Sequence, residues 1–328
     1  MNIQKAEMIA NDAMNLKRKM GIELELSCEH DSSPFNTLHE RLNDRGINTT
    51  INLRSHYGSN PNGWHIKRDG TPSNPPIFEI VSPPLCAIEM FNQLKVVIDI
   101  INEMKLGGTP FSVHKKCGLH IHHHAPKFTK SRGGRNYKRF KYLMNHFVKN
   151  EHNFDSMVAK SRRKSENGYC ETNECNLDRN IDVLIDYDCE RYRKLNLHSY
   201  SKHKTIEFRG HQGTLNFAKI VYWCAFTQAC LERSHREVKR TEGYQSPMIN
   251  YMLASGWGEH YEGGILPKND GCQQLIYYIC ATMQKFEVQQ PPIVYNRNEI
   301  RAEENNNVIT SLQGVFNEDA DDLQASFA

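Results

Sequence analysis

Four stretches of the chain alternate apolar and ionisable residues with the two-residue period of a β-strand. The first, GIELELSC, begins at Gly21 and places isoleucine and leucine on one face and Glu23 and Glu25 on the other. The other three are IFEIV with Glu79, GLHIHHH with His120 and His122, and TIEFRG with Glu207 and Arg209. A charged strand face ordinarily lies in water, which is the default interpretation of any one strand alone. Four such faces in one sheet instead predict a shared polar surface.

The remaining pattern predicts helices and short strands between these four stretches. Apolar residues recur at helical spacing in five segments, which are residues 1–20, 87–106, 136–150, 216–234 and 272–286. RYRKLNLHSY (191–200) and TIEFRGHQGT (205–214) read as two strands joined by the turn SKHK. The strands and helices follow no fixed βαβ interval, so the sequence predicts an α+β fold. We expect a mainly antiparallel, curved sheet with helices on its apolar outer face, which leaves the polar face concave.

Composition places the chain among globular proteins. The chain has 328 residues, of which 38% are hydrophobic and 24% charged. It contains no apolar run long enough to span a bilayer, and its N-terminal segment lacks the apolar stretch of a secretory signal. We therefore expect a cytoplasmic protein with no membrane partner, whose ten cysteines are reduced thiols.

Charge is distributed unevenly, although the net charge is only +3. Residues 127–164 are rich in Lys and Arg, whereas the chain from Glu299 onward is acidic. The basic segment fits a solvated helix face, a nucleic-acid surface or the wall of a polyphosphate site. The predicted organisation is an N-terminal helix (1–20), a catalytic domain (21–290) with a basic insertion at about 127–164, and a flexible acidic tail (291–328).

The ionisable residues on the four strands are carboxylates, imidazoles and an arginine. Clustered carboxylates repel one another unless a cation lies between them. Oxygen ligands favour Mg²⁺, and an imidazole ligand is better suited to Mn²⁺. An arginine beside such a metal suits phosphate oxygens. These residues predict a site for a nucleoside triphosphate, and the lack of a G-x-x-x-x-G-K-[ST] motif means that no P-loop holds its phosphates.

An ordered set of motifs gives a more specific indication. The set is GIELE, GWHIKRDGT with FEIVSP, CGLHIH, SRRKSENGYC, YRKLNL and TIEFRGHQGTLN. In this order the motifs resemble the amidoligase family, which belongs to the carboxylate–amine ligases with a glutamine-synthetase-like catalytic domain. The resemblance runs from about Gly21 to about Trp223. It implies a glutamine-synthetase-like half-barrel and ATP with Mg²⁺ or Mn²⁺ as cofactors.

The resemblance also implies metal ligands. Glu23 and Glu25 look like an E-x-E pair that serves two metal positions. Glu79 and Glu207 look like further carboxylate ligands. The imidazole near the metals and phosphates is implied to be His120 or His122, and the resemblance leaves that choice open.

The same resemblance implies anion-binding residues. Arg209 looks like a phosphate contact, and Arg193 with the pair Arg162–Arg163 look like further anion holders. Asp69 occupies the D-G-[ST] position, where it would position a metal or the amine. The sequence departs from the family pattern in its expanded basic stretch and its extra histidines, so the substrate class stays open.

The leading interpretation is an ATP-dependent ligase that joins a carboxylate, through an acyl phosphate, to an amine. Its substrates would be a carboxylate and an amine, including those of peptides or proteins, and the oligomeric state stays open. One alternative is a zinc hydrolase built on His120 and His122. The other is a nucleic-acid-binding protein that uses residues 127–164.

Overall fold

The computed structural model describes residues 1–28, 33–54, 60–130, 133–163, 168–176 and 179–237, with Leu275, Tyr278, Ile279 and Thr282. The predicted acidic tail lies outside these residues, as does most of the predicted helix 272–286. Among the described residues, no helix is long and apolar enough to cross a membrane.

Helices and strands alternate irregularly along the chain. The helices are α1 (Ile3–Ala13), α2 (Ser33–Asp44), α3 (Ala87–Leu106), α4 (Tyr137–Ser156), α5 (Ile181–Asp186), α6 (Ser199–His203) and α7 (Phe217–Glu237). The strands are β1 (Lys19–Cys28), β2 (Thr49–Asn52), β3 (Trp64–Arg68), β4 (Ile77–Val81), β5 (Leu85–Cys86), β6 (Phe111–Ser112), β7 (Gly118–His124), β8 (Leu195–Asn196) and β9 (Thr205–Gln212). The α+β prediction is confirmed.

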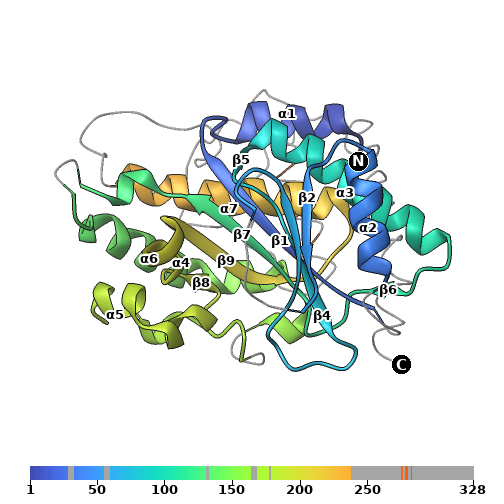
Figure 1. Cartoon of the computed structure of the whole chain (residues 1–328). Helices are drawn as coiled ribbons and strands as arrows, with labels where there is room; N and C mark the ends of the chain where they lie inside the picture. Colours follow the sequence, from blue (N-terminus) through green and yellow to red (C-terminus); the bar gives the residue numbers. More distant parts are fainter. Residues whose placement is uncertain are drawn as a thin grey trace.

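One open sheet organises the described residues. Its strand order is β2-β3-β4-β1-β7-β9-β8, with β5 and β6 also paired to β1 (Figure 1). Only the β2–β3 pair at one end is parallel among the described strands, so the prediction of a mainly antiparallel sheet is confirmed. The strands β4, β1, β7 and β9, which carry the predicted polar face, are therefore direct neighbours.

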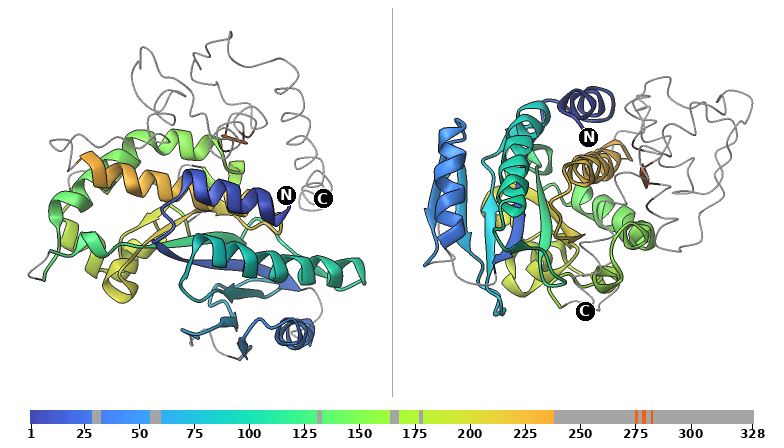
Figure 2. Two further views of the ribbon diagram at one scale, coloured as in Figure 1. Left: turned by 90° about the horizontal axis from the view of Figure 1, so that it is seen from above. Right: turned by 90° about the vertical axis from the view of Figure 1, so that its right-hand side faces the viewer.

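The apolar residues of these strands face a helical layer. Helix α7 contacts α1, α3, α4 and β7, while α3 also contacts β1. Strands β1, β7 and β9 pass in front of α7 in Figure 1, and α4 runs beside α7 in both views of Figure 2. The buried apolar strand residues in this core include Ile22, Leu24, Leu26, Ile80, Leu119, Ile121, Ile206 and Phe208. Each Å² of apolar surface buried against these helices contributes about 25 cal/mol to stability. This gain determines which face each strand turns toward the helices.

The chain between α5 and β9 differs from its predicted structure. The predicted strand 191–200 is wrong, because only Leu195–Asn196 forms a strand and α6 follows at Ser199. The Asn196 side chain accepts a hydrogen bond from the His198 N–H (2.8 Å), which turns the chain out of the sheet. Lys204 then ends α6 in the left-handed region (φ 56°). The predicted turn SKHK is therefore largely the last turn of a helix.

The N-terminal helix is confirmed, but over a shorter span than residues 1–20. Asn2 caps α1 by accepting a hydrogen bond from the Lys5 N–H (3.0 Å), and the helix ends at Ala13. Strand β1 already begins at Lys19, two residues before the predicted start of the catalytic domain.

A buried histidine makes the fold sensitive to acid. His211 on β9 packs against the Trp223 ring (4.9 Å between centroids) and donates from Nδ1 to the Gln212 carbonyl (2.6 Å). Burial lowers the pKa of His211 from its usual 6.5 to about 3. The unfolded chain therefore takes up a proton below pH 6.5 that the folded chain does not, so stability falls as pH drops from 6.5 toward 3.

Between pH 7.5 and 5.5, we expect the free energy of unfolding to fall by about 1 kcal/mol less in His211→Gln than in the wild type. Urea unfolding of both proteins with EDTA present measures this difference. Burial also lowers the pKa of His123, but His123 is present in both proteins and cancels. The same pH dependence in both proteins would show that the His211 side chain is not held neutral by the fold.

Candidate active site

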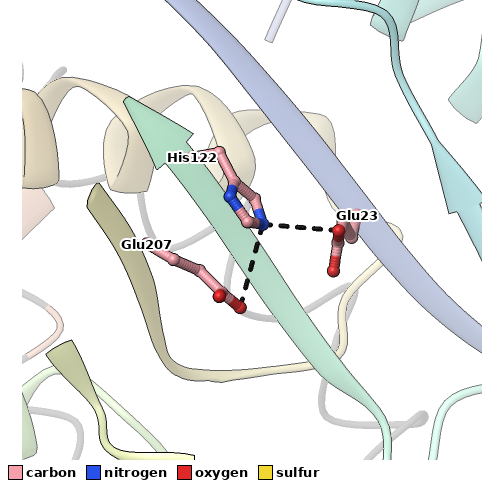
Figure 3. Close-up of side chains that lie close together, drawn as sticks. All are labelled: Glu23, His122 and Glu207. Carbon is pink, nitrogen blue, oxygen red and sulfur yellow. Dashed lines mark ion pairs between the residues drawn. The ribbon is translucent and has the colours of Figure 1, made fainter. Parts of the chain in front are cut away.

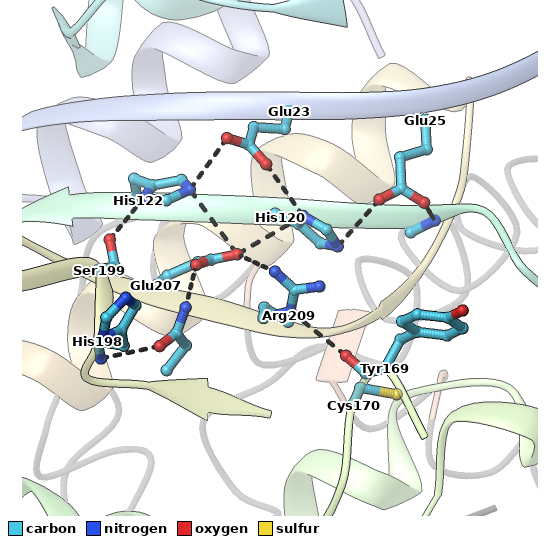
Figure 4. Close-up of polar contacts among 12 residues, drawn as sticks. Glu23, Glu25, His120, His122, Tyr169, Cys170, His198, Ser199, Glu207 and Arg209 are labelled. Atoms are coloured by element: carbon cyan, nitrogen blue, oxygen red, sulfur yellow. Dashed lines mark hydrogen bonds and ion pairs between the residues drawn. The ribbon is translucent and has the colours of Figure 1, made fainter. Parts of the chain in front are cut away.

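The strand register brings the predicted polar residues onto one sheet face. Glu25 on β1 lies opposite Glu79 on β4, and Glu23 on β1 lies opposite His120 on β7. His122 on β7 lies opposite Glu207 on β9. Figure 4 shows most of these side chains converging across β1, β7 and β9.

One potential metal-ligand group consists of Glu23, His122 and Glu207 (Figure 3). Each residue offers one ligand atom, and these atoms lie within 4.8 Å of one another. The His122 Nε2 atom is 3.3 Å from Glu23 Oε1 and 3.8 Å from Glu207 Oε1. Apart from these ion-pair contacts, this buried nitrogen has no hydrogen bond of standard geometry among the described residues, which suits an atom that can bind a metal ion. Two carboxylates and an imidazole fit Mn²⁺ or Mg²⁺ by donor type.

The other nitrogen of His122 is held by hydroxyl groups. Nδ1 lies 3.0 Å from the Ser199 hydroxyl and 3.1 Å from that of Thr205. Contacts of this kind orient a ligating imidazole, because they fix the ring while the opposite nitrogen faces the metal. The short helix α6 supplies Ser199, so the departure from the predicted strand serves the site directly.

Without a metal, charge within this first group is balanced by protonation of the histidine. Burial lowers the pKa of His122, but the charges of Glu207 and Glu23 outweigh burial and raise it to about 8. Burial also disfavours ionised Glu23, yet the nearby His122 and His120 hold the Glu23 pKa well below its usual value. A bound divalent cation would replace the positive charge of the imidazolium.

A second potential ligand group consists of Glu25, Asp69 and Glu79, whose ligand atoms also lie within 4.8 Å of one another. Asp69 follows β3 and is held there by a hydrogen bond from its N–H to the Ile77 carbonyl (2.9 Å). Burial and the charge of Glu23 raise the pKa of Glu79 to about 8, although Lys67 opposes the shift. Ionised Glu79 is therefore unfavourable unless a cation lies beside it.

His120 lies between the two groups. Its Nδ1 is 3.1 Å from Glu23 Oε2, and its Nε2 is 3.3 Å from Glu25 Oε1. Its position follows from the regular β1–β7 register, whereas the β7–β9 register shifts here because Arg209 and Gly210 on β9 both lie opposite His120. In the structure His122 belongs to a potential ligand group, whereas His120 contacts carboxylates of both groups.

Arg209 on β9 lies beside the first group. Its guanidinium donates to Glu207 Oε1 (3.0 Å) and to the Tyr169 carbonyl (3.4 Å), as Figure 4 shows. The second Glu207 oxygen accepts a hydrogen bond from the Asn196 amide (2.5 Å). Burial opposes the charge of Arg209, but Glu207 and Glu25 keep its pKa above the usual value. The guanidinium is therefore a fixed positive charge next to the ligand group.

Two predicted anion holders have other partners in the structure. Arg193 pairs with Glu171 (2.9 Å) and Glu190 (3.3 Å), so its charge is already neutralised. Arg163 donates to the Val158 carbonyl (3.1 Å). These contacts form through local loop packing that strand periodicity does not reveal.

Arg162 is buried and acts on the site through a backbone peptide group. It is 2% exposed, which is too buried to hold a phosphate as predicted. Its guanidinium donates to the Cys117 carbonyl, and the adjacent Gly118 N–H donates to Glu25 Oε2 (2.6 Å). Arg162 therefore fixes the peptide group that orients Glu25, rather than the anion itself.

The sequence interpretation missed several residues of the site. Lys67, Asn196, Ser199, Thr205 and Gly118 all contact a predicted ligand. Lys67 had a usable signal, because it lies on β3 directly opposite Glu79 on the neighbouring strand β4. The hydroxyl and amide residues had none, because polar residues near turns are common for local backbone reasons.

The described part of the basic segment is not one continuous cationic surface. Arg135 pairs with Asp182 and Asp186, and Arg139 and Arg162 are buried. The lysines at 127, 130, 138, 141 and 160 are exposed. These three arginines, which suit phosphate groups best, are thus used within the protein.

The fold and the site together define a protein with a carboxylate-rich centre suited to divalent cations on an antiparallel sheet. The family model described as "Putative amidoligase enzyme" matches residues 16–231, which is more than half of the chain. The chain belongs to this amidoligase family, as its motifs predict. No curated protein matches the chain. Among solved structures, a cryo-EM structure of Plasmodium falciparum glutamine synthetase is similar at 11% identity and a TM-score of 0.39, covering 98% of this chain and 75% of that one.

Gly118 tests how tightly the site is built. A Cβ there would lie 2.7 Å from His120 Nε2 and 3.4 Å from Glu25 Oε2, so Gly118→Ala must displace the imidazole. We expect its Mn²⁺ affinity to fall about tenfold or more, an effect of the size seen for contacts that orient metal ligands. Isothermal titration with Mn²⁺ measures the affinity.

Gly210 provides the matched control on β9. A Cβ there would meet only Lys194 side-chain carbons at 3.7 Å or more, so Gly210→Ala should keep wild-type affinity. Equal affinities for the two variants would contradict the assigned position of His120.

Proposed function

We propose that this protein is an ATP-dependent ligase that forms an amide or isopeptide bond between a carboxylate and an amine. The observation that carries the proposal is the pair of carboxylate ligand groups, linked by His120, with the Arg209 guanidinium beside them. Membership of the amidoligase family supports the same reaction class.

The ligands present fit one or two divalent cations, Mg²⁺ or Mn²⁺. Glu23, His122 and Glu207 would hold one ion, and Glu25 and Glu79 face the other position. A divalent cation bound there would neutralise triphosphate oxygens and the leaving ADP.

The chain's own residues would orient and stabilise the reacting groups. Arg209, held in place by Glu207 and the Tyr169 carbonyl, is positioned to bind the oxygens of the transferred phosphoryl group. Transfer of that group to the substrate carboxylate gives an acyl phosphate and ADP. The amine then attacks the acyl carbon, the amide bond forms, and phosphate leaves as the amine loses a proton.

The acidic second group suits the amine. Asp69 places negative charge next to the reaction centre, which favours binding of an ammonium group, and the raised pKa of Glu79 suits its carboxyl group to accept a proton. The substrates are a carboxylate and an amine, and amino acids, peptides and protein side chains all fit this chemistry. A cytoplasmic location, where ATP is abundant and thiols stay reduced, is part of the proposal.

The two alternatives have weaker structural support. A zinc hydrolase would use His120 and His122 together, but only His122 belongs to a ligand group among the described residues. A hydrolase also gives Arg209 no role. Nucleic-acid binding through residues 127–164 has less support, because arginines of this segment are ion-paired or buried and so do not face a ligand.

Glu207→Gln tests the proposal. The variant keeps the side-chain volume but removes a ligand charge and the Arg209 ion pair, so we expect ADP release to fall roughly a hundredfold or more. The assay measures ADP with Mg²⁺ or Mn²⁺, with and without a pool of amino acids, peptides and amines.

Glu232→Gln is the matched control, because Glu232 is an ion-paired glutamate on α7 that contacts Arg18 rather than the site. It should release ADP at close to the wild-type rate. Circular dichroism establishes that both variants are folded. Wild-type ADP release by Glu207→Gln would contradict the proposed role of Glu207.

A further inference from the structure

Lys67 occupies a position in the site that neither the family resemblance nor the strand pattern assigned. It lies on β3 directly opposite Glu79 on β4. Its Nζ atom is 2.7 Å from Glu79 Oε2, and the two side chains are only 18% and 13% exposed. Glu79 is a member of the second ligand group, so an ammonium group already contacts one of the three potential ligands there.

A positive charge beside the second group stabilises its ionised carboxylates. Their ligand atoms lie within 4.8 Å of one another, so the three groups repel when all are ionised. An ammonium group is a compact point charge with three hydrogen-bond donors, and it can satisfy carboxylate oxygens much as a small cation does.

We propose that the Lys67 ammonium takes the place of a second divalent cation, so that the substrate-free protein binds one ion, at Glu23, His122 and Glu207. The inference rests on the metal-binding part of the proposed function and not on the ligation chemistry. It differs from the two occupied metal positions that the resemblance implies.

The first group differs from the second in the chemistry of its nitrogen. The imidazole of His122 can give up its proton and offer a lone pair from Nε2 to a metal ion, whereas an ammonium group has no lone pair and can only exclude the ion. The cation beside the first group, Arg209, donates to Glu207 Oε1 (3.0 Å) and also to the Tyr169 carbonyl (3.4 Å). Its planar guanidinium binds Glu207 from one side, while Nε2 of His122 faces the same carboxylate and Glu23.

This arrangement has a consequence for the order of binding. In such a protein one ion is bound at the first group and Lys67 occupies the second position. A second ion can bind only together with a ligand that separates Lys67 from Glu79. A triphosphate is such a ligand, because its oxygens compete for the ammonium. Lys67 would then serve first as the counter-ion of the second group and afterwards as a phosphate contact.

The number of Mn²⁺ ions bound per chain tests the inference. We expect isothermal titration with MnCl₂ alone to give one ion for the wild type and two for Lys67→Met, which removes the charge but keeps a side chain of similar length. Lys67→Arg, which restores a positive charge, should bind one. Lys95→Met is the matched control, because it breaks a lysine–carboxylate pair with Asp99 on α3, away from the site, and should also bind one.

A wild type that binds two ions with similar affinity, or none, would overturn the inference, and so would a Lys67→Met protein that binds one. Electron paramagnetic resonance of the Mn²⁺-saturated wild type gives an independent answer if Lys67→Met does not fold. An isolated-ion spectrum is expected, and the broadened spectrum of two neighbouring Mn²⁺ ions would contradict the inference. ADP release is a separate assay, so failure of the ligase proposal and failure of the metal count are distinguishable.

Discussion

Repulsion among closely spaced carboxylates, which are buried or half-buried, is the constraint on which the rest of this site depends. Glu23, Glu25, Glu79 and Glu207 lie on one face of four neighbouring strands, and Asp69 joins them from the turn after β3. Desolvation and mutual repulsion would make such a surface unstable without positive charge close by. The nearby cationic groups reduce this repulsion.

The protein meets the constraint differently at the two ends of the surface. At one end, His122 and Arg209 share Glu207, and the histidine can act as a metal ligand as well as a charge. At the other end, Lys67 contacts Glu79 with a group that cannot ligate a metal. His120 lies between the two ends and contacts carboxylates of both. The two ends of one polar surface therefore suit different partners, a divalent cation at one and an ammonium or amine at the other.

Much of the fold and the central site could be predicted from the sequence, because strand periodicity is a local property. Alternation in β1, β4, β7 and β9 identifies their polar faces, and the core packing of the opposite faces brings these faces together. The contacts of Arg162 and Arg193 could not be predicted, because the partners of a charged residue in a loop depend on the tertiary structure. The predicted strand at 191–200 fails for a similar reason, because one side-chain hydrogen bond from Asn196 turns the chain into α6.

The central claim is that the polar sheet face binds a divalent cation through His122 and presents that ion to a nucleotide. Electron spin-echo spectroscopy of the protein with Mn²⁺ and a non-hydrolysable ATP analogue tests it most directly, because it detects the nuclei next to the ion. The account predicts a nitrogen coupling from one imidazole, which disappears in His122→Gln, together with a phosphorus coupling from the analogue. A spectrum with phosphorus coupling but no protein nitrogen, unchanged in His122→Gln, would contradict it.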